Sequence, residues 1–164
     1  MNKTEFKAQV AQFMSNNPDT DYQEGSEWMK ARAREVEVFL TEPNQDSNYA
    51  QVLASLDSLT IRDYALGIAV LNPKVAGAQL NLLLKACPVA LASAPATILA
   101  ILSYSADNRG QASMYLDKVR GNYPLAGLIK RVIAFNWAPE QFLTLTLELH
   151  PKVYASIYGE KAVA

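Results

Sequence analysis

The chain has 164 residues, of which 50% are hydrophobic and 19% are charged, and this length and composition predict one globular domain. Its 15 basic and 16 acidic residues give a net charge of -1, which counts against a nonspecific nucleic-acid binder, because such proteins carry a basic excess. A single cysteine excludes an intrachain disulfide. Because the chain also has only one histidine, a conventional zinc site is not expected.

The first 25 residues predict an amphipathic helix followed by a polar linker. From Thr4 to Met14 apolar side chains recur on one helical face, namely Phe6, Val10, Phe13 and Met14. Residues 15–25 are polar and contain proline and glycine, which is typical of a loop. We therefore expect an N-terminal arm and linker, residues 1–25, and a single all-helical domain, residues 26–164. The arm is expected to dock on the domain or on a neighbouring copy.

The second predicted helix begins at Ser26, whose hydroxyl suits an N-cap. One face of this helix is apolar, and the other is charged, with Lys30, Arg32, Arg34, Glu35 and Glu37. The cations could form a basic contact surface, or they could belong to a solvated face with ion pairs between neighbouring residues. Trp28 lies in the first turn of the helix and is a candidate anchor for a partner.

Two further helices are expected before Pro73, which starts the helix after them. The first spans about Ser47–Leu56, and the second opens at Thr60, where Thr60 and Asp63 resemble a capping box. Arg62 stands beside Asp63 in that first turn. It could reach an acidic partner or a phosphate, or it could pair with a carboxylate of the fold itself.

The stretch from Ser93 to Pro124 predicts two packed helices joined by a tight polar turn, the second over about Gly110–Val119. Ala100 and Ala112 stand where the two helices would cross. The order of bulky and small residues resembles one tetratricopeptide unit, but no second copy follows at a fixed period. The polar turn, with Asp107 and Arg109, is a second candidate contact.

Cys87, the helices that follow Pro124, and His150 are the remaining features of the sequence. Cys87 follows an apolar run, so we expect a buried small hydrophobe; a reactive thiol is the alternative, but no adjacent histidine supports it. Helices are predicted from Pro124, over about Pro139–Leu149, and from Pro151 to Gly159. His150 would then stand at a helix end, where a lone histidine caps the helix or lies on the surface.

A further set of residues between Thr60 and Glu140 has a distinctive order and spacing. They are Ile61-Arg62-Asp63, Cys87-Pro88, Ala94-Pro95-Ala96 with Leu99-Ala100, Gly110-Gln111-Ala112, Leu116-Asp117, Tyr123-Pro124-Leu125-Ala126 and Trp137-Ala138-Pro139. This region resembles the C-terminal helical half of an actinobacterial family, domain of unknown function 4192. That family usually has a preceding α/β half, whereas the residues before Thr60 here predict helix. The resemblance therefore implies a shortened, stand-alone relative, as in a phage or another mobile element, and it implies a fold without any chemistry.

The expected fold is an all-α stack of about nine or ten short helices, forming an irregular superhelix or bundle. No Gly-rich phosphate loop and no Gly-x-Ser-x-Gly elbow occur, so we expect no enzyme, no catalytic residue, no cofactor and no metal. An enzyme that uses carboxylates or tyrosine in a cleft has no positive support. Without a signal peptide or a membrane helix in the sequence, a cytoplasmic location without membrane association is expected.

The preferred function is a non-catalytic protein–protein interaction module, with self-association through the N-terminal helix as one form of it. The candidate contacts are Trp28, Arg32, Arg34, Arg62, Asp107 and Arg109, and Tyr22 and Trp137 are further aromatic anchors. The alternative is a nucleic-acid-binding accessory protein, which would use the cations Lys30, Arg32, Arg34, Arg62, Arg109, Lys130 and Arg131. The balanced charge counts against this alternative.

Overall fold

The structure is a computed structural model that describes residues 2–15, 25–43 and 48–159. Within these ranges the fold is all-α, with nine α-helices, one 3-10 turn and no strand. The elements are α1 (Lys3–Ser15), α2 (Glu27–Thr41), α3 (Tyr49–Ser55), α4 (Leu59–Leu71), α5 (Pro73–Ala86), η2 (Val89–Leu91), α6 (Ser93–Ser105), α7 (Arg109–Leu116), α8 (Pro124–Ala134) and α9 (Pro139–Tyr158). The predicted all-α stack is confirmed. Most of the predicted linker and the predicted helix start at Ser47 lie outside the described residues.

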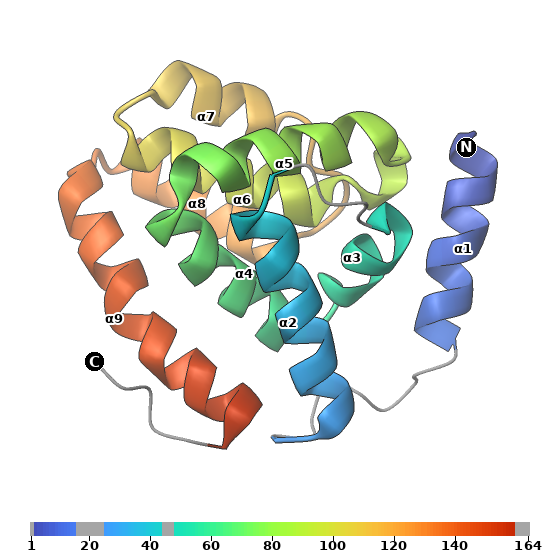
Figure 1. Cartoon of the computed structure of the whole chain (residues 1–164). Helices are drawn as coiled ribbons and strands as arrows, with labels where there is room; N and C mark the ends of the chain where they lie inside the picture. Colours follow the sequence, from blue (N-terminus) through green and yellow to red (C-terminus); the bar gives the residue numbers. More distant parts are fainter. Residues whose placement is uncertain (1, 16–24, 44–47, 160–164) are drawn as a thin grey trace.

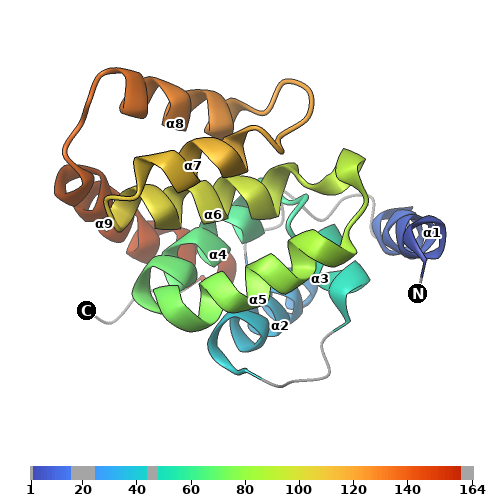
Figure 2. The ribbon, with the colours of Figure 1, turned by 90° about the horizontal axis from the view of Figure 1, so that it is seen from above.

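Neighbouring helices form a layered stack with α6 at its centre. In Figure 2, α8, α7, α6 and α5 lie side by side, and α2 follows beyond α5. α4 lies behind this layer and contacts α2, α5 and α6, while α9 covers α4 on the outer side (Figure 1). Nine of the thirteen residues of α6 are buried, as expected for a helix that has neighbours on most sides.

The predicted hairpin is present as α6 and α7. Ala100 and Ala112 are both fully buried, so the two backbones approach closely where the helices meet. The second helix ends at Leu116 and is shorter than the expected Gly110–Val119. Its N-cap is Asn108, whose side chain accepts a hydrogen bond from the backbone of Gln111.

Local caps decide where the helices begin. The Ser26 hydroxyl accepts a hydrogen bond from the Met29 backbone amide at 3.1 Å, so the predicted cap of α2 is confirmed. The predicted cap at Thr60 is wrong, because α4 begins at Leu59 and Ser58 caps it by accepting from the Ile61 amide at 3.4 Å. Thr60 is already inside the first turn, where its hydroxyl cannot serve as an N-cap.

The predicted break at Pro151 is also wrong, since α9 runs without interruption from Pro139 to Tyr158. A proline inside a helix removes one backbone donor and ordinarily ends the helix. Here both halves of α9 bury residues against the bundle, Phe142 before the proline and Ile157 after it, so tertiary packing outweighs the local preference. Gly159 ends the helix with a left-handed backbone, as predicted.

Helix α1 lies at the edge of the molecule, beside α3 (Figure 1). In the described part of the chain, α3 is its principal neighbour. Phe6 and Val10 anchor it, with 3% and 2% of their surfaces exposed. This docking leaves a space between the second half of α1 and the bundle.

Candidate functional site

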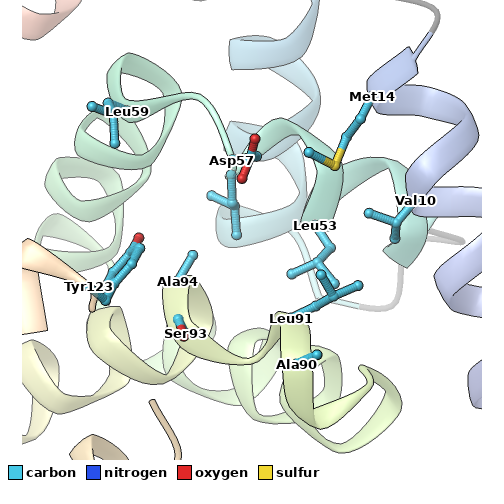
Figure 3. Close-up of a pocket in the computed structure, with 11 residues that line it drawn as sticks. Val10, Met14, Leu53, Asp57, Leu59, Ala90, Leu91, Ser93, Ala94 and Tyr123 are labelled. Atoms are coloured by element: carbon cyan, nitrogen blue, oxygen red, sulfur yellow. The ribbon is translucent and has the colours of Figure 1, made fainter. Parts of the chain in front are cut away.

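The space beside α1 is a hollow of about 190 Å³, which we call the α1 hollow. Its apolar wall comes from Val10 and Met14 of α1 and from Leu53, Leu56, Leu59 and Leu91 of the bundle. Its polar atoms belong to Asp57, Ser93 and Tyr123. Figure 3 shows the Met14 side chain reaching from α1 into this space. A hollow with a mostly apolar wall and a few polar groups suits an apolar side chain of a binding partner.

The spacing of apolar residues along α1 explains why the hollow exists. Phe6, Val10 and Met14 are four residues apart, so they form one row on the helix surface. Phe6 and Val10 are buried, but Met14 is 39% exposed. The first half of α1 therefore seals against α3, while the second half leaves the space beneath it incompletely filled.

Hydrogen bonds hold the polar wall of the hollow in place. The Ser93 hydroxyl accepts from the Arg120 amide at 3.1 Å and donates to the Arg120 carbonyl at 3.2 Å. These two bonds tie the start of α6 to the loop between α7 and α8. Tyr123 lies at the end of that loop. The Arg62 guanidinium lies over the Tyr123 ring, 5.7 Å from the ring centre.

Arg62 is 8% exposed and is bound within the fold. Its Nε and Nη2 donate to Oδ1 of Asp63 at 2.9 and 2.6 Å. Burial lowers the pKa of Arg62, but the hydrogen bonds and charge of Asp63 outweigh it, so the pKa is raised overall. Burial also raises the pKa of Tyr123. The geometry therefore favours pairing of Arg62 within the fold; its partner is the adjacent Asp63 rather than an acid on another helix.

A second polar group lies where α9 covers α2 and α4. The Tyr64 hydroxyl donates to Oε2 of Glu37 at 2.7 Å, and the His150 ring stacks on Tyr64 at 5.5 Å. Tyr154 and Tyr158 of α9 complete this Tyr64 cluster. Burial and the hydrogen bond to Glu37 raise the pKa of Tyr64 far above its usual range, so its hydroxyl stays protonated.

The expectation that His150 caps a helix or lies on the surface is wrong. His150 lies inside α9, and its Nδ1 atom is buried without a hydrogen-bond partner in the described structure. The ring fits against Gly67, where any Cβ would overlap it. Burial lowers the pKa of His150, although the charge of Glu37 raises it. A glycine inside a helix often marks a place where another group packs closely against the backbone. Gly67, three residues after Tyr64, was therefore the sequence signal that α4 has a close neighbour at this point.

Two ion pairs join neighbouring charged residues of α2. Lys30 lies 3.5 Å from Glu27, and Arg32 lies 3.2 Å from Glu35. The neighbouring ion pairs are therefore present, but Arg32 and Glu35 are half-buried and do not form a solvated face. Burial raises the pKa of Glu35, and Arg32 opposes that shift.

The remaining predicted contacts lie apart from one another. Trp28 is half-buried against the core, and exposed Arg34 lies 6.0 Å from the ring centre of Tyr158. At the α6–α7 turn, Asp107 pairs with Arg109 at 3.7 Å. The six predicted contacts lie on α2, on α4 and at this turn, so they do not form one site, and none of them lines the α1 hollow.

Exposed aromatic side chains lie in the turn between α8 and α9. Trp137 is largely exposed in the turn before α9, and Phe135, which the sequence reasoning did not single out, is 75% exposed beside it. The Arg109 guanidinium donates to the side chain of Asn136 and thereby fixes this turn to the start of α7. Tyr22 lies outside the described residues.

Cys87 is buried, as predicted. Its thiol lies 3.5 Å from the Leu84 carbonyl, and burial raises its pKa although Lys3 lowers it. Among the residues that the structure describes, no group of three or more His, Cys, Asp or Glu side chains could hold a metal ion. No helix in the described ranges has the length and apolar character needed to cross a membrane.

Comparison with protein families gives a match to the domain of unknown function (DUF4192) over residues 2–140. Neither curated proteins nor solved structures gave a match. The family match extends further toward the N-terminus than the resemblance between Thr60 and Glu140, and it includes α1, α2 and α3. Since the match covers well over half of the sequence, the chain belongs to the DUF4192 family.

Proposed function

We propose that this chain is a non-catalytic protein-interaction module whose α3 face receives an amphipathic helix. The helix bound there is α1, either from the same chain or from a second copy. We place the module in the cytoplasm, as an accessory protein of a phage or another mobile element in an actinobacterium. The support for this setting is the family resemblance and the use of a single cysteine.

The observation that carries the proposal is the way α1 is held. It packs chiefly on one short helix, through two buried anchors, at the edge of the fold (Figures 1 and 2). Beneath its second half the α1 hollow of about 190 Å³ is incompletely filled. An amphipathic helix that lays its apolar face into an apolar groove is a common mode of helix recognition.

The nucleic-acid alternative has less support from the same contacts. Four of its seven cations pair with a nearby carboxylate: Lys30, Arg32, Arg62 and Arg109. A cation that is already paired contributes less to counterion release from nucleic acid. The paired cations therefore favour the protein-interaction module over a nucleic-acid-binding protein.

The test is binding of an isolated arm to a chain whose own arm has been released. Phe6→Asp places a charge at a buried anchor and is expected to free α1, because burying an unpaired carboxylate is costly. A fluorescent peptide of residues 2–15 should bind this variant, as measured by anisotropy. It should bind the unchanged chain far more weakly, because a tethered arm competes at an effective concentration of about 1 mM.

Two controls keep the result specific. Gln12→Asp introduces the same charge at an exposed position of α1, and this chain should behave like the unchanged one. A peptide that itself carries Phe6→Asp should not bind. The proposal is overturned if the released chain keeps its helical circular dichroism and still binds neither the peptide nor a second copy.

A further inference from the structure

A pocket of about 260 Å³ lies beside the connection between α5 and α6, other residues of which line the α1 hollow. Four cations line it, Lys3, Lys85, Lys118 and Arg120, and no described lining residue is acidic. The cations come from the start of α1, the last turn of α5 and the loop between α7 and α8. We call this the basic pocket. It brings together more than a quarter of the chain's 15 basic residues, although the whole chain is slightly acidic.

These cations are distinguished by lining one pocket together and not by being unpaired, because most of the described basic residues form no ion pair. The ion pairs of the described structure involve Lys30, Arg32, Arg62 and Arg109, each with a carboxylate close in sequence. The four cations of the basic pocket make no such pair within the described ranges. Like charges gathered around one cavity repel one another, and an anion bound between them would offset that repulsion.

Hydrogen bonds give the pocket a fixed frame. The Arg120 guanidinium donates to the carbonyls of Asp117 at 2.8 Å and Val119 at 3.3 Å. Its backbone is held by Ser93 through the two bonds described above. A guanidinium placed in this way loses less side-chain entropy when it binds an anion.

The rest of the lining is apolar or neutral. Leu84, Val89 and Ala92 supply hydrocarbon surface, and the Cys87 thiol is directed to the Leu84 carbonyl. Burial raises the pKa of the Cys87 thiol, and the positive charge of Lys3 partly opposes this shift. The raised pKa of Cys87 keeps the thiol protonated, so the pocket needs no thiol chemistry to function.

We propose that the basic pocket binds a small phosphorylated molecule, with its phosphate groups among the four cations and its uncharged part against Leu84, Val89 and Ala92. A phosphate group matches this arrangement better than a single carboxylate, because it carries more charge and more acceptor oxygens. Arginine binds phosphate in a bidentate manner and lysine binds it as a point charge. This site does not rest on the proposed function, since three of its four cations belong to the bundle rather than to α1.

The experiment is calorimetric titration with inorganic pyrophosphate at constant ionic strength. The unchanged chain should bind one pyrophosphate, and orthophosphate should bind more weakly. The variant with Lys85→Gln and Lys118→Gln should bind pyrophosphate about tenfold more weakly or worse. The control carries Lys130→Gln and Arg131→Gln on exposed positions of α8, loses the same charge, and should stay within about twofold of the unchanged chain. Circular dichroism of each variant establishes that it is folded.

Each other result overturns the proposal. No saturable binding by the folded, unchanged chain would mean that the pocket does not bind phosphate groups. An equal loss in both double variants would mean that pyrophosphate senses only the overall charge. A short oligothymidylate that displaces pyrophosphate and binds more tightly would identify a nucleic-acid backbone as the ligand instead of a small molecule. The arm-peptide assay reports on α1 alone, so failure of either proposal can be recognised separately.

Discussion

Replacement of Gly67 by alanine tests the packing of α9 directly. A Cβ at this position would lie 2.0 Å from Nδ1 of His150 and 2.5 Å from its Cγ. Ordinary contacts between such atoms are about 3.5 Å, so the ring or α9 must move by about 1.5 Å. Overpacking of this kind costs about 1–3 kcal/mol, while alanine gains about 0.8–1.0 kcal/mol over glycine in a helix. We expect a net loss of up to about 2 kcal/mol in the free energy of unfolding.

The assay is urea unfolding of a double-mutant cycle. In a chain that already carries His150→Ala the obstructing ring is absent, so Gly67→Ala should stabilise by about 0.8–1.0 kcal/mol. The sign of the effect should therefore reverse between the two backgrounds. Gly77 is the matched control, because it lies inside α5 with no atom near an added Cβ. Gly77→Ala should stabilise both backgrounds equally.

One outcome would refute this reasoning. If Gly67→Ala destabilises the chain by the same amount with and without the histidine, the cost does not come from the contact with His150. The close approach of α4 and α9 would then have another cause.

Two further predictions concern α9. Burial lowers the pKa of His150 from its ordinary 6.5, so the unfolded chain takes up this proton at a higher pH than the folded chain. Neutral His150 therefore contributes fully to the free energy of unfolding above about pH 6.5. This contribution is lost as the pH falls toward the pKa of His150 in the folded chain. Thermal melts between about pH 8 and about pH 5 should show this loss, and an equally steep loss in His150→Ala would contradict it. Pro151→Ala restores the backbone donor for the Leu147 carbonyl and should stabilise by about 1–3 kcal/mol in urea unfolding, whereas unchanged stability would argue against a cost of the proline.

The features of the fold that depend on local chemistry could be predicted from the sequence. Ser26 caps α2 and Pro73 opens α5 because capping and the fixed backbone angle of proline act within a few residues. The family resemblance likewise rested on order and spacing along the chain. The hairpin crossing followed from Ala100 and Ala112, which are small residues on two consecutive predicted helices.

The prediction failed where contacts distant in sequence decide the outcome. Pro151 would end an isolated helix, but the burial of Phe142 and Ile157 keeps α9 continuous. The same helix brings His150 onto Tyr64, a contact that no local pattern indicates. The basic pocket was missed for the same reason, since Lys3, Lys85 and Lys118 meet only after three separate segments have folded together.

Helix α1 contributes a wall to two cavities, Val10 and Met14 to the α1 hollow and Lys3 to the basic pocket. Withdrawal of this one helix would therefore open both cavities at once. Lys3 of docked α1 should raise the affinity of the basic pocket for an anion. By thermodynamic linkage, a bound anion must then favour docking of α1 by the same factor. A chain built in this way would couple the level of a small phosphorylated molecule to the balance between docked and withdrawn α1.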